Sequence, residues 1–295
     1  MNYPEPWQVN KLSGSLGAEI TGVSLSSFSD EDITAIKSLL IEHKVIFFPG
    51  QDLSNDQHVA LGKNFGPLEG HPNLAADSTL PPEIFQLKAT NGGVADEWHS
   101  DITFQERPAL MSILLMVTCP ETGGDTMWSS LEAAYDELSD PMKEMCEGLT
   151  ALHDALPHNR PEKMAVHPVV RVHPETGKKS LYVNEHFTRR LVELSALESD
   201  ALLNHLTRWV TNPRFTVRYR WTEGTIAMWD NRCTQHFVLN DFEGERVIRR
   251  VTVMGDAVSG TCDPRWRPWV REGRLSATSR HDRQLFQYLR SQKLV

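Results

Sequence analysis

The stretch Glu97-Trp98-His99-Ser100-Asp101-Ile102-Thr103-Phe104 places a histidine and an aspartate two residues apart. In an extended strand, side chains two positions apart point to the same side, so His99 and Asp101 could bind one metal ion. A distant histidine, His236, can supply a third ligand. Two histidines and one carboxylate form a facial triad, whose open positions suit non-heme Fe(II) and O₂ chemistry. The pair alone is a weak signal, because many surface strands carry such a pair, and catalytic zinc fits the same ligand types.

On both sides of this stretch, apolar and β-branched runs predict strands. They lie at 44–48, 84–87, 111–117, 169–172, 180–184, 216–221, 225–229 and 247–254. Serines followed by apolar residues at helical spacing predict helices that begin after Ser29, Ser54 and Ser195. Many strands with helices before and between them indicate a mainly β fold with flanking helices, in the form of a β-sandwich or jelly roll.

The length and composition are those of a soluble globular chain. It has 295 residues, of which 40% are hydrophobic and 23% charged. We expect one domain over 1–260. The segment 261–295 is basic and aromatic, and we expect it to form a helical tail packed on that domain.

Several classes of partner are disfavoured by the composition. A formal net charge of −9 without a basic stripe argues against a nucleic-acid surface. The four cysteines show no C-x-x-C spacing, so neither a zinc knuckle nor a disulfide framework is indicated. The amino terminus shows no secretory leader, and no apolar run approaches the length of a membrane span. We therefore expect no membrane association and a cytoplasmic location.

Two arginines after the third candidate ligand could bind an anion. Arg246 lies ten residues after His236, and Arg250 lies four residues further on. If iron binds a 2-oxo acid through its 1-carboxylate and 2-keto oxygen, the far carboxylate of that acid needs a cation, ideally a bidentate arginine. In an extended strand the two arginines fall on one face, which is costly in an apolar interior unless each meets an anion. The alternative is that both are solvated or paired with Glu243 and Glu245.

Several motifs, in order from Leu12 to Asp256, resemble those of one known family. They are Trp98-His99-Ser100-Asp101-Ile102-Thr103-Phe104, Gly123-Gly124-Asp125-Thr126, His167-Pro168-Val169-Val170-Arg171, Val183-Asn184-Glu185, Trp229-Asp230-Asn231-Arg232, Gln235-His236 and Arg246-Val247-Ile248-Arg249-Arg250-Val251-Thr252. The chain is similar to the taurine dioxygenase family of Fe(II)- and 2-oxoglutarate-dependent dioxygenases. A lone motif is only a hypothesis, but several in the same order make the resemblance specific.

This resemblance implies a fold and a set of roles. The fold is a double-stranded β-helix, a jelly roll of the cupin type. His99, Asp101 and His236 match the positions that hold Fe(II). Thr126 and Arg246 match the positions that bind the distal carboxylate of the cosubstrate 2-oxoglutarate. Relatives in this family commonly self-associate, so a homo-oligomer is expected.

The resemblance also implies a substrate site. His71 and Arg250 match the positions that hold the sulfonate of taurine, and Phe187 matches a wall of the substrate pocket. On its own, a loop histidine such as His71 is more often a solvated side chain. Taurine-specific members have an asparagine and a tyrosine where this chain has Ala95 and Leu74, which removes polar partners for an ammonium group. We expect a small anionic organic substrate that is more apolar than taurine, namely a sulfonate, an alkyl sulfate or a carboxylate.

The family chemistry is hydroxylation of a substrate carbon with O₂. If that carbon bears the sulfur or the ester oxygen, the product would collapse to an aldehyde with release of sulfite or sulfate. One alternative is a taurine dioxygenase proper. In other classes, the alternatives are a metal-dependent hydrolase, which should work without O₂, and a non-catalytic jelly-roll binding protein, which would need no intact triad.

Overall fold

The computed structural model describes residues 3–70, 72, 79–90, 95–270 and 280–293. The chain forms two compact units, which are described separately below. Unit 1 comprises Met1–Asp101, Ala109–Ser130 and Pro213–Asp256, and unit 2 comprises Ile102–Pro108, Leu131–Asn212 and Ala257–Val295. The single domain over 1–260 stays a prediction.

Unit 1 is built on two sheets. The larger sheet has eight strands, in the order β1 (Gln8–Lys11), β2 (Ala18–Thr21), β3 (Val45–Phe48), β14 (Ile226–Asp230), β6 (Ala109–Thr118), β16 (Glu245–Met254) and β4 (Leu68–Glu69), with β5 (Ile84–Thr90) also paired to β16. The smaller sheet has the order β13 (Thr216–Tyr219), β7 (Thr126–Ser130) and β15 (Thr234–Val238). A short 3₁₀ helix, η2 (Pro213–Phe215), precedes β13.

The core of unit 1 follows from the alternation of side chains along the strands. Val45 and Phe47 of β3 belong to the cluster shared with the smaller sheet, where the Phe47 ring meets the Trp128 ring of β7 edge-on at 5.2 Å between centroids. Ile46 and Phe48 point to the opposite face and join a second cluster. Both faces of this strand are buried, which explains its continuous apolar run.

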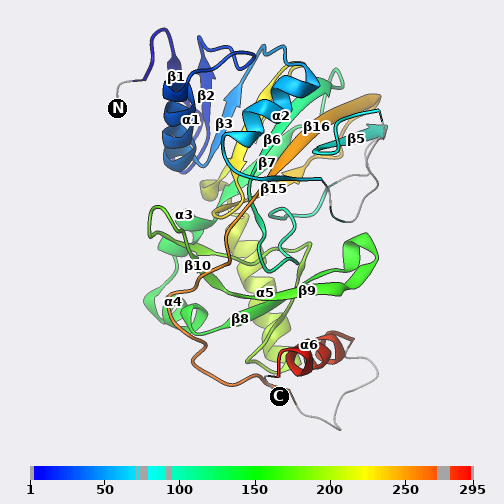
Figure 1. The fold of residues 1–295 in the computed structure, drawn as a ribbon. Helices are drawn as coiled ribbons and strands as arrows, with labels where there is room; N and C mark the ends of the chain where they lie inside the picture. The colour runs from blue at the N-terminus through cyan, green and yellow to red at the C-terminus, as the bar shows by residue number, and fades with distance from the viewer. Residues whose placement is uncertain (1–2, 71, 73–78, 91–94, 271–279, 294–295) are drawn as a thin grey trace. The chain divides into compact units, whose positions relative to one another are not determined.

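Two helices cover the outer face of the large sheet, as Figure 1 shows. They are α1 (Asp30–His43) and α2 (Asn55–Lys63), whose apolar side chains complete the second cluster. The hydroxyls of Ser29 and Ser54 each accept a hydrogen bond from the backbone N–H three residues on, at 3.2 Å in both cases. Such caps satisfy a donor that the helix itself leaves open, so both predicted helix starts are confirmed.

Unit 2 combines short sheets with four helices. One sheet has the order β12 (Thr188–Leu191), β8 (Thr150–Ala155) and β9 (Arg160–Pro168), and β10 (Val170–Val172) forms a hairpin with β11 (Lys179–Leu181). The helices are α3 (Leu131–Asp136), α4 (Asp140–Glu147), α5 (Ala196–Val210) and α6 (Arg280–Ser291), and a 3₁₀ helix, η1 (Leu156–His158), joins β8 to β9. The mainly β fold with flanking helices is confirmed.

The carboxyl-terminal helix α6, red in Figure 1, packs on unit 2. Its Leu285 and Leu289 are buried in one cluster with Leu152 of β8 and Val192. Among the described residues, no helix combines the length and the apolar character needed to cross a membrane.

Candidate metal centre

The stretch around His99 and Asp101 is not the strand that its sequence predicts. His99 forms a single antiparallel bridge with His236, through two backbone hydrogen bonds of 3.0 and 2.7 Å, and a turn begins at Asp101. Ile102 has a φ of 49°, a left-handed value that no strand contains. The strand prediction is therefore wrong. Non-local side-chain contacts replace the ladder: the Ser100 hydroxyl donates to the Thr234 carbonyl at 2.7 Å.

The three predicted metal ligands nevertheless converge. His99, Asp101 and His236 are all buried, and one ligand atom from each lies within 4.8 Å of the others. The His99 Nδ1–H donates to the Glu97 carbonyl at 2.7 Å. Because a carbonyl can only accept, Nδ1 carries a proton, which leaves Nε2 as the ring nitrogen that can offer a lone pair to a metal. This donor set fits a divalent metal ion.

The Asp101 carboxylate is held by two donors. Arg250 donates from Nη1 to Oδ1 at 2.6 Å, and the Ser112 hydroxyl donates to Oδ2 at 2.7 Å. Burial by itself raises the pKa of this carboxyl. Arg250, His236, His99 and Ser112 act in the opposite direction and hold the pKa well below its usual range. The centre therefore keeps one anionic ligand and two imidazoles.

A buried cation lies on the same face of β16 as Arg250. Arg246 is 2% exposed, and it donates from Nε to the Gly124 carbonyl at 3.2 Å and from Nη2 to the Thr126 hydroxyl at 3.4 Å. Burial lowers the pKa of Arg246 to about 10, so it remains charged at neutral pH. Both acceptors are neutral oxygens, and a buried charge of this kind is costly unless an anion compensates it.

The Thr126 hydroxyl is arranged to donate to the same anion. Its oxygen accepts from Trp221 Nε1 at 2.9 Å and from Arg246 at 3.4 Å. An oxygen that accepts two hydrogen bonds directs its own proton elsewhere. Thr126 and Arg246 can therefore present a hydroxyl and a guanidinium to one carboxylate.

Arg250 stands where a second anion could meet the metal centre. Besides its bond to Asp101, its guanidinium lies 5.4 Å from the centre of the Phe85 ring. Its buried Nε–H has no hydrogen-bond partner among the described residues. These contacts of Arg246 and Arg250 contradict the alternative in which both are solvated or paired with Glu243 and Glu245.

The remaining predicted substrate residues are not joined to this centre by the structure. His71 and Leu74 lie outside the described residues. Phe187 belongs to unit 2, where it is buried and meets the rings of Phe104 and His158 edge-on at 5.3 and 5.5 Å between centroids. The roles of His71 and Phe187 in substrate binding stay predictions.

Sequence reasoning missed three partners of these sites. They are Ser112, Asn231 and Trp221. Ser112 carries a signal that could have found it, because it is the one polar residue within the apolar run 111–117. A buried hydroxyl on a core strand requires a partner. Asn231 and Trp221 give no such signal, because the site residues that they contact, Asp101 and Thr126, are distant in sequence.

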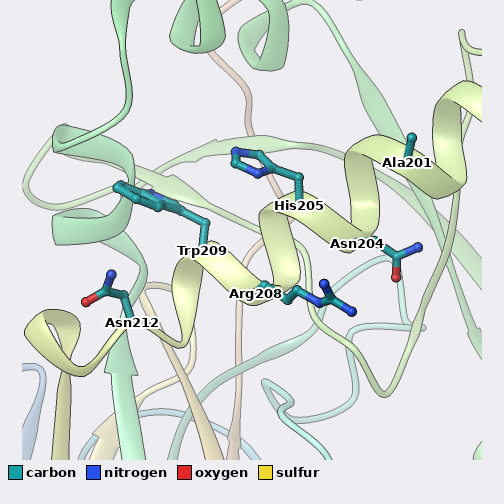
Figure 2. A pocket seen from close by; sticks show the side chains of 6 residues that line it. All are labelled: Ala201, Asn204, His205, Arg208, Trp209 and Asn212. Carbon is teal, nitrogen blue, oxygen red and sulfur yellow. The ribbon is translucent and has the colours of Figure 1, made fainter.

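A separate hollow of 420 Å³ lies along α5 in unit 2 (Figure 2). It is lined by Ala201, Asn204, His205, Arg208, Trp209 and Asn212. Figure 2 shows that His205 and Trp209 extend from one side of the helix and Asn204 and Arg208 from the other. These groups do not converge on one point, so we assign this hollow no ligand.

The sequence and the fold of this chain are similar to those of known proteins. Residues 8–252 match the model of the family described as taurine catabolism dioxygenase TauD, TfdA family. An alkylsulfatase of Acinetobacter baylyi is 40% identical over 283 residues, which cover 88% of each chain. An alpha-ketoglutarate-dependent sulfate ester dioxygenase of Pseudomonas putida is 37% identical and covers 92% of this chain and 94% of its own. The crystal structure of a taurine dioxygenase from Burkholderia xenovorans superposes with a TM-score of 0.79 at 37% identity, covering 86% of this chain and 91% of that one.

Proposed function

The chain belongs to the taurine catabolism dioxygenase TauD, TfdA family, and from this premise we propose that it is an Fe(II)- and 2-oxoglutarate-dependent dioxygenase acting on alkyl sulfate esters. The observation that carries the proposal is the buried pair of Arg246 and Thr126, which offers a second anion site on the strand that also carries Arg250. A hydrolase would need the metal centre but not this site. A non-catalytic binding protein would need neither.

Each residue of the centre has a definite task in this proposal. His99, Asp101 and His236 would hold Fe(II), which together with 2-oxoglutarate and O₂ supplies the oxidation of a substrate C–H bond. Arg246 and Thr126 would bind the distal carboxylate of 2-oxoglutarate through a charge-assisted pair and a hydroxyl. The low pKa of Asp101 keeps its carboxylate ionised over the whole neutral range.

Three observations favour a sulfate ester as the substrate. Among the residues that the structure describes, the buried Nε–H of Arg250 beside the metal centre has no partner, which suits an oxyanion head group. Ala95 offers no side-chain acceptor for the ammonium group of taurine. Two relatives that match nearly the whole chain are named for sulfate-ester chemistry. A cytoplasmic location and self-association, expected from the sequence, stay predictions.

The proposed reaction balances without a further reagent. One oxygen atom of O₂ enters 2-oxoglutarate, which leaves as succinate and CO₂, and the other enters the C–H bond of the carbon that bears the ester oxygen. The resulting hydroxylated ester loses sulfate and a proton as its C–O bond breaks, which leaves an aldehyde.

The test is reconstitution without oxygen, followed by addition of O₂. The protein is loaded with Fe(II) and 2-oxoglutarate and offered a linear alkyl sulfate, the matching sulfonate, the matching carboxylate and taurine. We expect succinate, sulfate and aldehyde in equal amounts with the alkyl sulfate, and little succinate with taurine. Release of sulfate and an alcohol without O₂ would establish the hydrolase instead. Faster turnover of taurine would establish a taurine dioxygenase.

A further inference from the structure

A closed ring of hydrogen bonds lies behind the Asp101 carboxylate. The Asn231 Oδ1 accepts from the Asp101 backbone N–H at 3.1 Å, and the Asn231 Nδ2 donates to the Ser112 hydroxyl oxygen at 3.1 Å. Ser112 in turn donates to Asp101 Oδ2 at 2.7 Å. Asn231 and Ser112 are each fully buried, and the whole ring belongs to unit 1.

The direction of every hydrogen bond in this ring is determined. The Asn231 Oδ1 also accepts from Trp229 Nε1 at 3.0 Å. The indole N–H and the backbone N–H can only donate, so the amide atom that faces them must be the oxygen. The other amide atom is then an NH₂ group, which donates to Ser112. Ser112 has one proton, and that proton must go to Asp101.

We propose that Asn231 is a positioning residue for the metal centre, which acts on Asp101 both directly, through the backbone N–H, and indirectly, by directing the Ser112 proton to the carboxylate. This inference rests on the proposed function, because it assumes that a metal binds the triad. The ring fixes the main chain and the side chain of the one anionic ligand at the same time. Partners of this kind orient a ligand, and their loss typically weakens metal binding by about 10- to 100-fold.

Asn231 also has a contact that belongs to the fold alone. Its backbone N–H donates to the Leu110 carbonyl at 2.9 Å, which continues the pairing of β14 with β6, where Trp229 lies opposite Ser112. A purely structural role of the side chain would therefore lower the melting temperature of the metal-free protein and leave its metal affinity unchanged. The two roles are separable by measuring both quantities.

The experiment is a double-mutant cycle on the full chain with Mn(II) as the probe. Mn(II) binding is followed by electron paramagnetic resonance for wild type, Asn231→Ala, Ser112→Ala and the double variant. The exposed Asn10 of β1 provides the matched control, Asn10→Ala. We expect Mn(II) dissociation constants about 10- to 100-fold higher for each single variant and unchanged for the control. The Mn(II) dissociation constant of the double variant should exceed that of wild type by clearly less than the product of the two single fold-increases, because both substitutions act on the same carboxylate.

Three results would overturn the inference or its premise. Unchanged Mn(II) affinity in both single variants, with a lower melting temperature, would make the ring structural. If the fold-increase of the Mn(II) dissociation constant in the double variant equals the product of the two single increases, Asn231 and Ser112 act independently, and Asn231 does not act through Ser112. If Asn231→Ala does not fold, the Mn(II) affinities of Ser112→Ala and Ser112→Thr are compared instead. Only Ser112→Thr retains a hydroxyl, so this variant should bind Mn(II) like wild type, whereas Ser112→Ala should bind it more weakly. A wild type that binds no Mn(II) would instead contradict the proposed function.

Discussion

Each unit of this protein contains a pair of histidines whose rings are close to each other, and the two pairs have different neighbours. In unit 1, the ring centroids of His99 and His236 are 4.1 Å apart. In unit 2, those of His153 and His167 are 5.2 Å apart. The first pair has the Asp101 carboxylate beside it. The hydrogen-bond partners of the second pair are neutral groups.

Most of these neutral partners come from the segment 103–105, and the Thr188 hydroxyl lies 3.3 Å from His153 Nδ1. The Thr103 hydroxyl lies 3.0 Å from His153 Nδ1, and the carbonyls of Thr103 and Gln105 accept from His167 Nε2 at 2.9 and 3.0 Å. Burial lowers the pKa of His167 to about 4, and burial, His167 and Arg189 hold the pKa of His153 well below its usual range. Among the described residues, the groups that could hold a metal ion include the first pair with Asp101 and do not include the second pair. The difference is the carboxylate, which would supply the negative charge that a divalent metal ion favours.

The largest effect should come from removing the charge that distinguishes the first pair. Asp101→Ala leaves His99 and His236 in place but takes away the anionic ligand. We expect Mn(II) binding at least about 100-fold weaker and loss of 2-oxoglutarate turnover. Mn(II) titration and succinate formation measure both. Full succinate formation by this variant would contradict the triad.

Acid should unfold the protein partly through the second pair. The folded state favours neutral His167, with a pKa of about 4 against an ordinary 6.5, so the unfolded chain binds its proton first as the pH falls. The free energy of unfolding should then decrease from pH 6.5 to 4, by up to about 3 kcal/mol for this residue. Urea unfolding at several pH values measures it.

Burial also lowers the pKa of His58 in unit 1 to about 4, so His58 contributes to the dependence of the wild-type unfolding free energy on pH. The variant His167→Gln separates the two contributions, because it removes only that of His167. The variant should show a shallower loss of stability between pH 6.5 and 4. An identical slope would mean that His167 takes up no extra proton on unfolding.

The strand that carries both arginines, β16, could be predicted from the sequence. The even spacing of Arg246 and Arg250 predicts that they lie on one face of a strand. The structure confirms this, because both belong to β16, and Ile248, which lies between them at the same spacing, is buried in the cluster shared with the smaller sheet. Period-two alternation is a local property, so it can be read from a short stretch. The buried run of β6 and the capped helices were predictable for the same reason.

The local structure around Asp101 could not be predicted in this way. Its turn is held by Asn231 and Thr234, which lie more than a hundred residues further along the chain. Propensity and spacing carry no information about such partners. Likewise, the division into two units joins segments from both ends of the chain, and no run of linker residues announces it.

The two arginines of β16 extend this contrast, because Arg250 donates to Asp101 beside the first pair and Arg246 lies buried next to Thr126. Arg246→Ala should raise the KM for 2-oxoglutarate by about tenfold to hundredfold through loss of a charge-assisted pair. Arg250→Ala should raise the KM for the alkyl sulfate more than that for 2-oxoglutarate. Initial rates with each substrate varied in turn measure both constants. The reverse order would show that the two arginines exchange roles.

The smallest effect should come from the second pair at neutral pH. His153→Leu removes the imidazole from the Thr103 hydroxyl, but Asn184 still donates to that hydroxyl from Nδ2 at 3.3 Å. The Thr188 hydroxyl, which lies 3.3 Å from His153 Nδ1, likewise still accepts from the Asn184 backbone N–H at 2.9 Å. Because both hydroxyls keep a partner, the loss in the free energy of unfolding should be only about 1 kcal/mol. Urea unfolding at pH 7 measures this, and Mn(II) titration of the same variant should give the wild-type dissociation constant. A variant that folds but binds Mn(II) more weakly would mean that the second pair supports the metal centre, and the contrast between a pair with a carboxylate beside it and a pair with neutral hydrogen-bond partners would no longer hold.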